Sequence, residues 1–217
     1  MNNGIIENST MNRKFGFLLA IVALLVTVVV KHNREKRAEA FTEAEREIIL
    51  QSDSVMNVTT YPKDSLVLRT ICQDLSAEEL TSPLLKTLMD KMLCTVQDPS
   101  QDGVGISAPQ VGITKRIIWL TRLDLEGEPW RCYLNIHIDS LFGPKIKLPE
   151  GCLSLPGLRG TVVRDSSVIV SYIDPTSLQP ARDTVHGYTA RIFQHECDHL
   201  EGRLYTDVAD SVYVSNR

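Results

Sequence analysis

The strongest chemical signal in the sequence is a short run near its C-terminal end, His195-Glu196-Cys197-Asp198-His199. The two histidines are four residues apart, so one turn of an α-helix would place both imidazoles on the same side, where each can offer a nitrogen to one metal ion. Glu196 would then lie beside the ion without binding it. A coincidental run, with two partly exposed histidines beside neighbouring acids, is the alternative for this segment alone.

Two histidines do not complete a hydrolytic metal site, so the third ligand decides the class of enzyme. In metzincins a third histidine follows, but Tyr205 holds that position here; gluzincins use a later glutamate, and no Glu follows Glu201. The third ligand is therefore expected upstream. Cys152 is the candidate, because it lies between Gly151 and the proline-ended loop at Pro156, where a thiolate can face a metal. Taken alone, such a cysteine is more often a small core residue.

A glycine-rich segment, residues 103–112 (GVGISAPQVG), is the third signal. It matches the Gly-x-Gly-x-x-Gly/Ala dinucleotide pattern, but that motif needs a strand before it and a helix after it. Here a helix is expected before it, and Pro109 and Gly112 disfavour a helix after it. We favour an extended strand that lets another backbone come close, with Gln110 donating a side-chain N–H to a ligand. An ordinary Gly/Pro loop is the alternative.

Taken in order, these three segments resemble the signature motifs of the peptide deformylase family, over residues 64–207. The resemblance implies an α+β fold in which antiparallel sheets pack around the helix that carries the histidines. It also implies that Cys152, His195 and His199 bind one divalent metal ion. We expect Fe²⁺, with Zn²⁺, Ni²⁺ or Co²⁺ as alternatives, since mixed thiolate and imidazole ligands suit all four.

The reaction implied by the resemblance is removal of the formyl group from N-formylmethionyl peptides, nascent chains included, with release of formate. By analogy, Glu196 takes a proton from the attacking water and returns it to the leaving nitrogen. The Gln110 side-chain amide and the Leu153 backbone N–H would hold the developing oxyanion together with the metal. The Gly105 backbone would pair with the substrate main chain. Arg159 is assigned to substrate binding near the cysteine loop, with an ordinary surface arginine as the alternative.

Two further functions are weighed against this one. A metallopeptidase that cleaves internal amide bonds would fit the His-Glu-x-x-His run alone, and a non-catalytic binding protein could retain the fold. The sequence also departs from the family pattern, with Ser107 where alanine is common and Ile136 where proline is frequent. Neither departure affects a proposed ligand or the proton-transferring acid, so we expect catalysis.

Helices and strands without regular alternation are expected to position these residues, which favours an α+β fold. Residues 82–96 combine a capping serine, a first-turn proline and apolar residues at helical spacing, and so predict a core helix. A short helix is expected at 41–51 and strands at 115–121, 130–135 and 167–173. The histidine helix, 191–201, is expected to expose one polar arc, made of Arg191, Gln194, Asp198 and Glu201.

An apolar segment at residues 15–30, with basic residues on both sides, predicts a membrane anchor or a signal peptide. We expect a membrane tether with the catalytic domain in the cytoplasm, and an exported domain as the alternative. The chain then divides into the apolar segment at 1–40, a linker with a short helix at 41–63, and the catalytic domain at 64–217.

Composition limits the other partners. The formal net charge of −4 provides no basic surface for a phosphate backbone, so direct binding of nucleic acid is not expected. The 5 cysteines are scattered and odd in number, unlike a disulfide-rich secreted scaffold, so at least one free thiol is expected. We expect a monomer with one catalytic domain.

Overall fold

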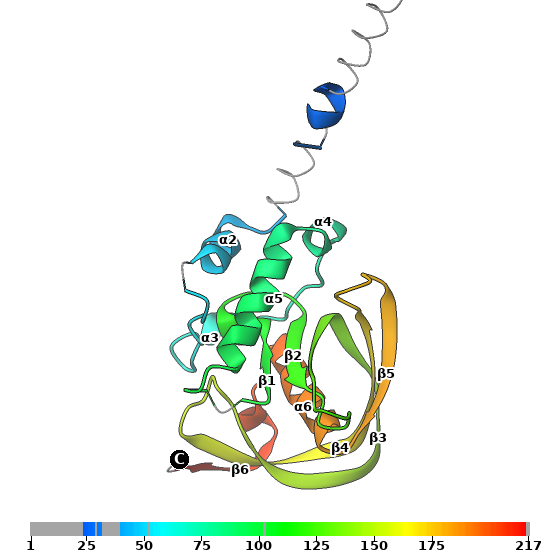
Figure 1. The fold of residues 1–217 in the computed structure, drawn as a ribbon. Helices are drawn as coiled ribbons and strands as arrows, with labels where there is room; N and C mark the ends of the chain where they lie inside the picture. The colour runs from blue at the N-terminus through cyan, green and yellow to red at the C-terminus, as the bar shows by residue number, and fades with distance from the viewer. Residues whose placement is uncertain (1–23, 29, 32–39, 52, 102, 216–217) are drawn as a thin grey trace, which may run out of the picture.

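The computed structural model describes residues 24–28, 30–31, 40–51, 53–101 and 103–215. Helices cover the first part of this region, and strands with one long helix make up the second (Figure 1). In chain order the elements are α2 (Glu43–Leu50), α3 (Ser65–Leu68), α4 (Ala77–Leu80), α5 (Pro83–Val96), β1 (Gly105–Ser107), η1 (Ala108–Val111), β2 (Ile117–Thr121), β3 (Trp130–Gly151), β4 (Leu158–Ile173), β5 (Pro180–His186), α6 (Gly187–Leu200), η2 (Tyr205–Asp207) and β6 (Ala209–Val214).

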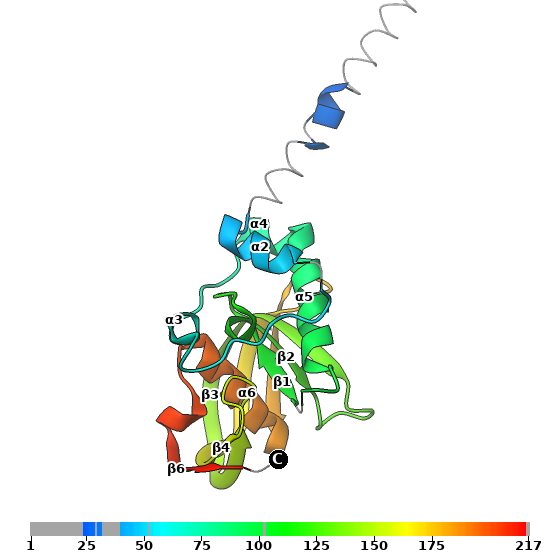
Figure 2. The ribbon, with the colours of Figure 1, turned by 90° about the vertical axis from the view of Figure 1, so that its left-hand side faces the viewer.

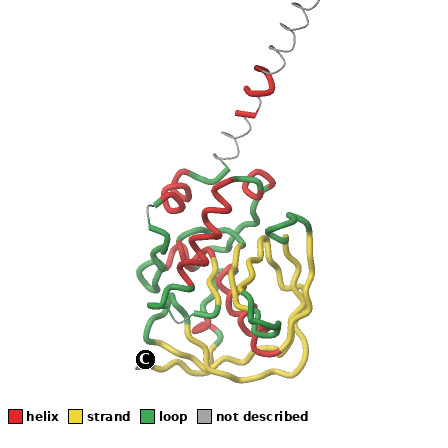
Figure 3. The backbone as a smooth tube through the Cα atoms, viewed as in Figure 1, coloured by secondary structure: helices red, strands yellow, loops and turns green. Residues whose placement is uncertain are grey.

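The strands form one six-stranded antiparallel sheet in the order β1-β2-β3-β4-β5, and β6 pairs with β4 as well. The long β3 and β4 strands make a curved hairpin, and the tube view shows the strands around α6 (Figure 3). The expected α+β fold, with antiparallel strands around the histidine helix, is confirmed. The three predicted strands lie largely within β2, β3 and β4, but β3 and β4 continue far beyond them.

Strand β2 separates two hydrophobic cores because its side chains alternate between the faces of the sheet. Ile117 packs in the core that contains α5, whereas Ile118 packs in the core that contains α6. The predicted helix at 82–96 is confirmed as α5, with Ser82 accepting a hydrogen bond from the Leu84 N–H and proline at the first position. Both ribbon views place α5 and α6 on different sides of β2 (Figures 1 and 2).

Helix α2 belongs to the core that contains α5. Thr42 caps it through a reciprocal pair of hydrogen bonds with Glu45. Phe41 and Ile49 are 2% and 0% exposed within that core. Burying an apolar side chain of this size contributes about 1.5–3 kcal/mol, so the short helix expected at 41–51 is an integral part of the folded unit.

The polar arc predicted for the histidine helix is not exposed, which corrects the expectation from the sequence. Arg191, Gln194 and Asp198 are 4%, 4% and 6% exposed, and only Glu201, after the end of α6, is exposed. The reason is that β3 and β4 pass over this side of the helix and provide partners for each polar group. The Gln194 amide, for example, donates to the backbone oxygen of Asp165 in β4.

The expected membrane-associated location is contradicted. Within the described residues, no helix is long and apolar enough to cross a bilayer. Within the apolar segment, the structure describes residues 24–28 as helix. The rest of the apolar segment, apart from residue 30, lies outside the described residues.

Candidate metal centre

Helix α6 and the turn after β3 bring three candidate ligands together. Atoms of Cys152, His195 and His199 lie within 4.8 Å of one another, and Cys152 Sγ lies 3.2 Å from His199 Nε2. Ligand atoms that bind one ion at about 2.0–2.3 Å in a tetrahedral arrangement must lie about as close to one another as these three atoms do. Two imidazoles and a thiolate therefore fit a divalent transition metal, with a fourth position left for a reactant.

The thiol of Cys152 is prepared to act as a ligand. Burial raises its pKa, but the charges of His199 and His195 and their hydrogen bonds lower it more, leaving a pKa of about 5. Burial by itself lowers the pKa of His195. The hydrogen bonds that His195 makes to Cys152 and Glu150 outweigh this effect and raise its pKa well above the ordinary value. Together the groups form a thiolate–imidazolium pair in which a cation can replace the proton.

Glu150, at the end of β3, fixes the orientation of His195 and was not identified from the sequence. Its Oε2 accepts a hydrogen bond from His195 Nδ1 at 3.0 Å, which leaves Nε2 of the same ring for a metal. The carboxylate also pairs with Arg164 at 2.9 Å and Arg191 at 2.6 Å. Burial raises the pKa of this carboxyl, but the hydrogen bonds and charges of His195 and Arg164 hold it far below its ordinary value. The only signal in the sequence was its position two residues before Cys152.

Tyr205 supports the other side of the same histidine. Its ring stacks on His195, with centroids 6.0 Å apart and planes at 23°. The side chain is 1% exposed, and its hydroxyl has no hydrogen-bond partner among the described residues. Burial raises the pKa of this phenol to about 12, so it is neutral at physiological pH, and the group of three candidate ligands does not include it.

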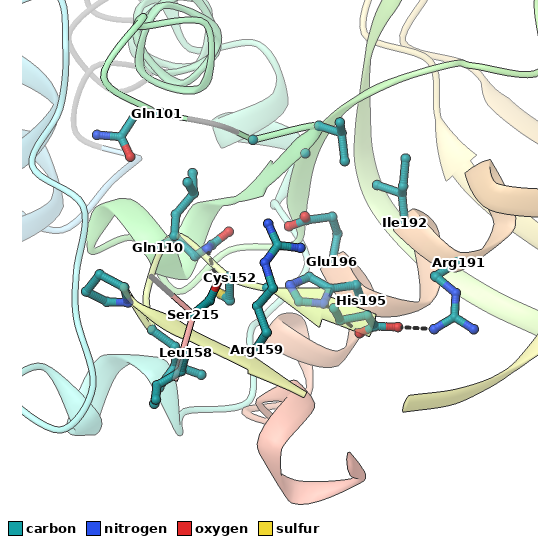
Figure 4. Close-up of a pocket in the computed structure, with 18 of the residues that line it drawn as sticks. Gln101, Gln110, Cys152, Leu158, Arg159, Arg191, Ile192, His195, Glu196 and Ser215 are labelled. Atoms are coloured by element: carbon teal, nitrogen blue, oxygen red, sulfur yellow. Dashed lines mark hydrogen bonds and ion pairs between the residues drawn. The ribbon is translucent and has the colours of Figure 1, made fainter. Parts of the chain in front are cut away.

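Glu196 points into the pocket beside the ligands (Figure 4). It is 4% exposed, and its Oε2 has no hydrogen-bond partner among the described residues. Burial raises its pKa to about 7, so the carboxyl can both accept and release a proton near neutral pH. Gly105 in β1 lies against it, because a Cβ there would stand 2.6 Å from Glu196 Oε1.

Gln110, in η1, presents its amide N–H groups to the same space. Its Nε2 donates to Cys152 Sγ at 3.4 Å and to Ser154 Oγ at 3.3 Å. Its Oε1 accepts from the backbone N–H and the hydroxyl of Ser107 at 2.9 and 3.0 Å. In the residue after Cys152, the backbone N–H of Leu153 donates to no backbone acceptor among the described residues. Two donors are therefore available for a developing negative charge.

The pocket has a volume of about 630 Å³ and brings together most of the residues predicted from the sequence. Its lining includes Gly105, Gln110, Cys152, Leu153, Arg159, His195 and Glu196. Only His199 is absent from the lining, because it is 1% exposed and lies behind Cys152. Arg159 lines the same pocket as His195 and Glu196 and makes no ion pair within the described part of the chain (Figure 4). The pocket therefore brings the predicted residues together, whereas Glu150, Tyr205 and Ser154 contact them without having been predicted.

Comparisons with known proteins agree with this site. A family model described as polypeptide deformylase matches residues 55–214. The peptide deformylase of Lachnoclostridium phytofermentans is 39% identical over 164 residues, which cover 76% of this chain and 88% of that protein. The peptide deformylase of Leptospira biflexa is 34% identical over 148 residues, which cover 65% of this chain and 81% of that protein.

Solved structures give the same result. The actinonin-bound class I type b peptide deformylase of Acinetobacter baumannii is 35% identical with a TM-score of 0.64, and the match covers 72% of this chain and 99% of that one. The Met-Ala-Ser-bound form of that enzyme matches with a TM-score of 0.62 at 35% identity, over 70% of this chain and 98% of that chain. An actinonin complex of the Synechococcus elongatus enzyme matches at 34% identity with a TM-score of 0.64, over 74% and 81% of the two chains.

Proposed function

This chain belongs to the polypeptide deformylase family and is a hydrolase that removes N-formyl groups, and we propose that the pocket around Cys152, His195 and His199 is where it does so. The observation that carries the proposal is the convergence of these three ligands with a buried acid, Glu196, and an inward-facing amide, Gln110. The two alternatives, a metallopeptidase and a non-catalytic binding protein, are not favoured by the comparisons.

The cofactor we propose is one divalent ion, Fe²⁺, held by the Cys152 sulfur and the Nε2 atoms of His195 and His199. When bound, the ion supplies a Lewis acid that polarises the formyl carbonyl and makes water more acidic. The chain orients the ligand His195. Glu150 accepts a hydrogen bond from Nδ1 and so fixes the tautomer of the imidazole, and the stacked Tyr205 ring restrains the plane of that imidazole. Zn²⁺, Ni²⁺ and Co²⁺ suit the same donors.

Glu196 is proposed to move the protons. Its carboxylate takes one proton from the attacking water, and the resulting carboxylic acid gives it to the leaving amide nitrogen as the carbon–nitrogen bond breaks. The products are formate and a free amino terminus. A pKa near neutrality suits both steps, and the unpartnered Oε2 is free to reach a reactant.

Gln110 and Leu153 are proposed to stabilise the oxyanion that forms on the former carbonyl oxygen. The Gln110 side-chain N–H and the Leu153 backbone N–H both border the pocket beside Cys152. Hydrogen bonds from donors that are already aligned strengthen as negative charge develops on the oxygen. Losing one such donor typically costs on the order of 10²–10³-fold in rate.

The substrates we propose are N-formylmethionyl peptides that add a strand to the sheet. Strand β1 is at the end of the sheet order, so the edge that contains Gly105 is free of a neighbouring strand within the described residues. A peptide main chain can pair with such an edge. The Met-Ala-Ser complex of the Acinetobacter enzyme supports this substrate class. Arg159, which also lines the pocket, would bind the peptide beyond its first residue.

The test is formate release by the full chain, loaded with Fe²⁺ under anaerobic conditions, from formyl-Met-Ala-Ser. N-acetyl-Met-Ala-Ser is the matched substrate control, since a general metallopeptidase would hydrolyse both peptides. Glu196→Gln keeps the size of the side chain and removes the base. Formate from the formyl peptide alone, lost in Glu196→Gln, supports the proposal, and a metal-loaded wild type that releases no formate refutes it.

A further inference from the structure

Ser107 occupies a position between the sheet edge and the proposed oxyanion donor. It is the last residue of β1, is 0% exposed and immediately precedes η1, which carries Gln110. Its backbone N–H and its hydroxyl both contact the same atom, Gln110 Oε1, at 2.9 and 3.0 Å. No part of the mechanism above uses this hydroxyl.

The hydrogen bonds of Ser107 fix the orientation of the Gln110 amide. A backbone N–H can only donate, so the atom that it contacts is the amide oxygen of Gln110 rather than its nitrogen. The hydroxyl lies 3.0 Å from the same oxygen and donates to it, with the Glu196 carboxyl as the other acceptor within its reach. This leaves the Gln110 NH₂ group facing Cys152 and Ser154, on the side where the reacting carbonyl would lie.

We propose that the Ser107 hydroxyl is a positioning group that holds the Gln110 amide in place and polarises it as a hydrogen-bond donor. Two donors on one amide oxygen draw electron density away from the nitrogen, and chains of hydrogen bonds strengthen one another in a buried setting. They also restrain a side chain that otherwise has several rotatable bonds. The inference rests on the proposed function, because it assigns Ser107 to the stabilisation of that reaction's oxyanion.

The expected effect of Ser107→Ala is smaller than that of Gln110→Ala, because the backbone N–H bond to Gln110 remains. We expect kcat to fall about 3- to 10-fold, the factor that one net hydrogen bond contributes to an equilibrium. KM should change less than about 2-fold, because the oxyanion contact acts in the transition state. Ser167→Ala is the matched control, since it removes another buried hydroxyl, bonded to His186 and outside the pocket.

The decisive measurement is a double-mutant cycle in the full, metal-loaded chain. If Ser107 acts through Gln110, Ser107→Ala lowers kcat in the wild type and has no further effect in Gln110→Ala. The side-chain NH₂ resonances of Gln110, identified by their loss in Gln110→Ala, should shift in Ser107→Ala and stay in place in Ser167→Ala. An equal loss of kcat in both backgrounds, no loss in the wild type, or unmoved Gln110 resonances would each overturn the inference. A wild type that releases no formate refutes the proposed function instead.

Discussion

Replacing Glu150 by glutamine tests whether the metal centre depends on a buried charge network. The carboxylate accepts hydrogen bonds from Arg164 Nε at 3.0 Å, Arg164 Nη2 at 2.9 Å, Arg191 Nη1 at 2.6 Å and His195 Nδ1 at 3.0 Å. Glu150, Arg164 and Arg191 are 6%, 7% and 4% exposed, so water cannot replace the lost charge. Glu150→Gln leaves two guanidinium groups buried with Asp198 as the remaining nearby anion.

The size of the effect follows from that burial. Removing one partner of a buried ion pair typically costs about 3–5 kcal/mol, because the other charge remains uncompensated. For a domain of this size each kcal/mol lowers the melting temperature by about 2–4 °C, so we expect a fall of roughly 6–20 °C. Metal affinity should also fall about 10- to 100-fold, since Gln no longer orients His195 as a charged acceptor does.

The assay pairs urea unfolding with chelator competition, and Asp139→Asn is the matched control. That change also converts a carboxylate partner of an arginine to an amide, but Arg182 and Asp139 have 63% and 28% side-chain exposure. Exposed pairs contribute about 0–1 kcal/mol. If Glu150→Gln loses no more unfolding free energy than Asp139→Asn, and binds metal equally well, the network does not support the site as argued.

Three other changes test particular contacts. Gly105→Ala places a Cβ 2.6 Å from Glu196 Oε1, so we expect kcat to fall on the order of 10²-fold with little change in melting temperature; near-normal turnover would contradict this. Tyr205→Phe removes a buried hydroxyl without a partner among the described residues, so unfolding by urea should show equal or higher stability, and a loss above about 1 kcal/mol would reveal a missing partner. The side-chain hydrogen bond to Arg122 lowers the pKa of Asp124, so this carboxylate stabilises the fold above its unfolded pKa and loses that effect as pH falls through the folded pKa. Asp124→Asn should therefore cost about 1 kcal/mol at pH 7 and progressively less in acid, and a constant difference in urea midpoint across pH would be inconsistent with the pair.

The helices and the pair of candidate histidine ligands could be predicted because their signals are local. Ser82 and Pro83 mark the start of α5 within three residues of its apolar stripe, and the His195–His199 spacing is a property of one helical turn. Most of β3 could not be predicted in this way. Its second half is largely exposed, contains Gly143, Pro144 and Pro149, which disfavour a strand, and alternates only over the four residues 145–148; there it pairs with β4. That information lies in the partner strand rather than in the segment itself.

The role of Glu150 could not be predicted from the sequence, because its partners lie far from it along the chain. Arg164 and Arg191 are 14 and 41 residues away from Glu150 in sequence, and His195 is 45 residues away. Each of these charged residues, taken alone, is of a type that usually lies on the surface of a protein. They are buried because β3, β4 and α6 pack together, and the charges can be buried because every one of them finds an opposite partner there. Orientation of His195 is therefore a property of the assembled fold, which predicts that mutations weakening the β3–β4 pairing will lower metal affinity even where no ligand is touched.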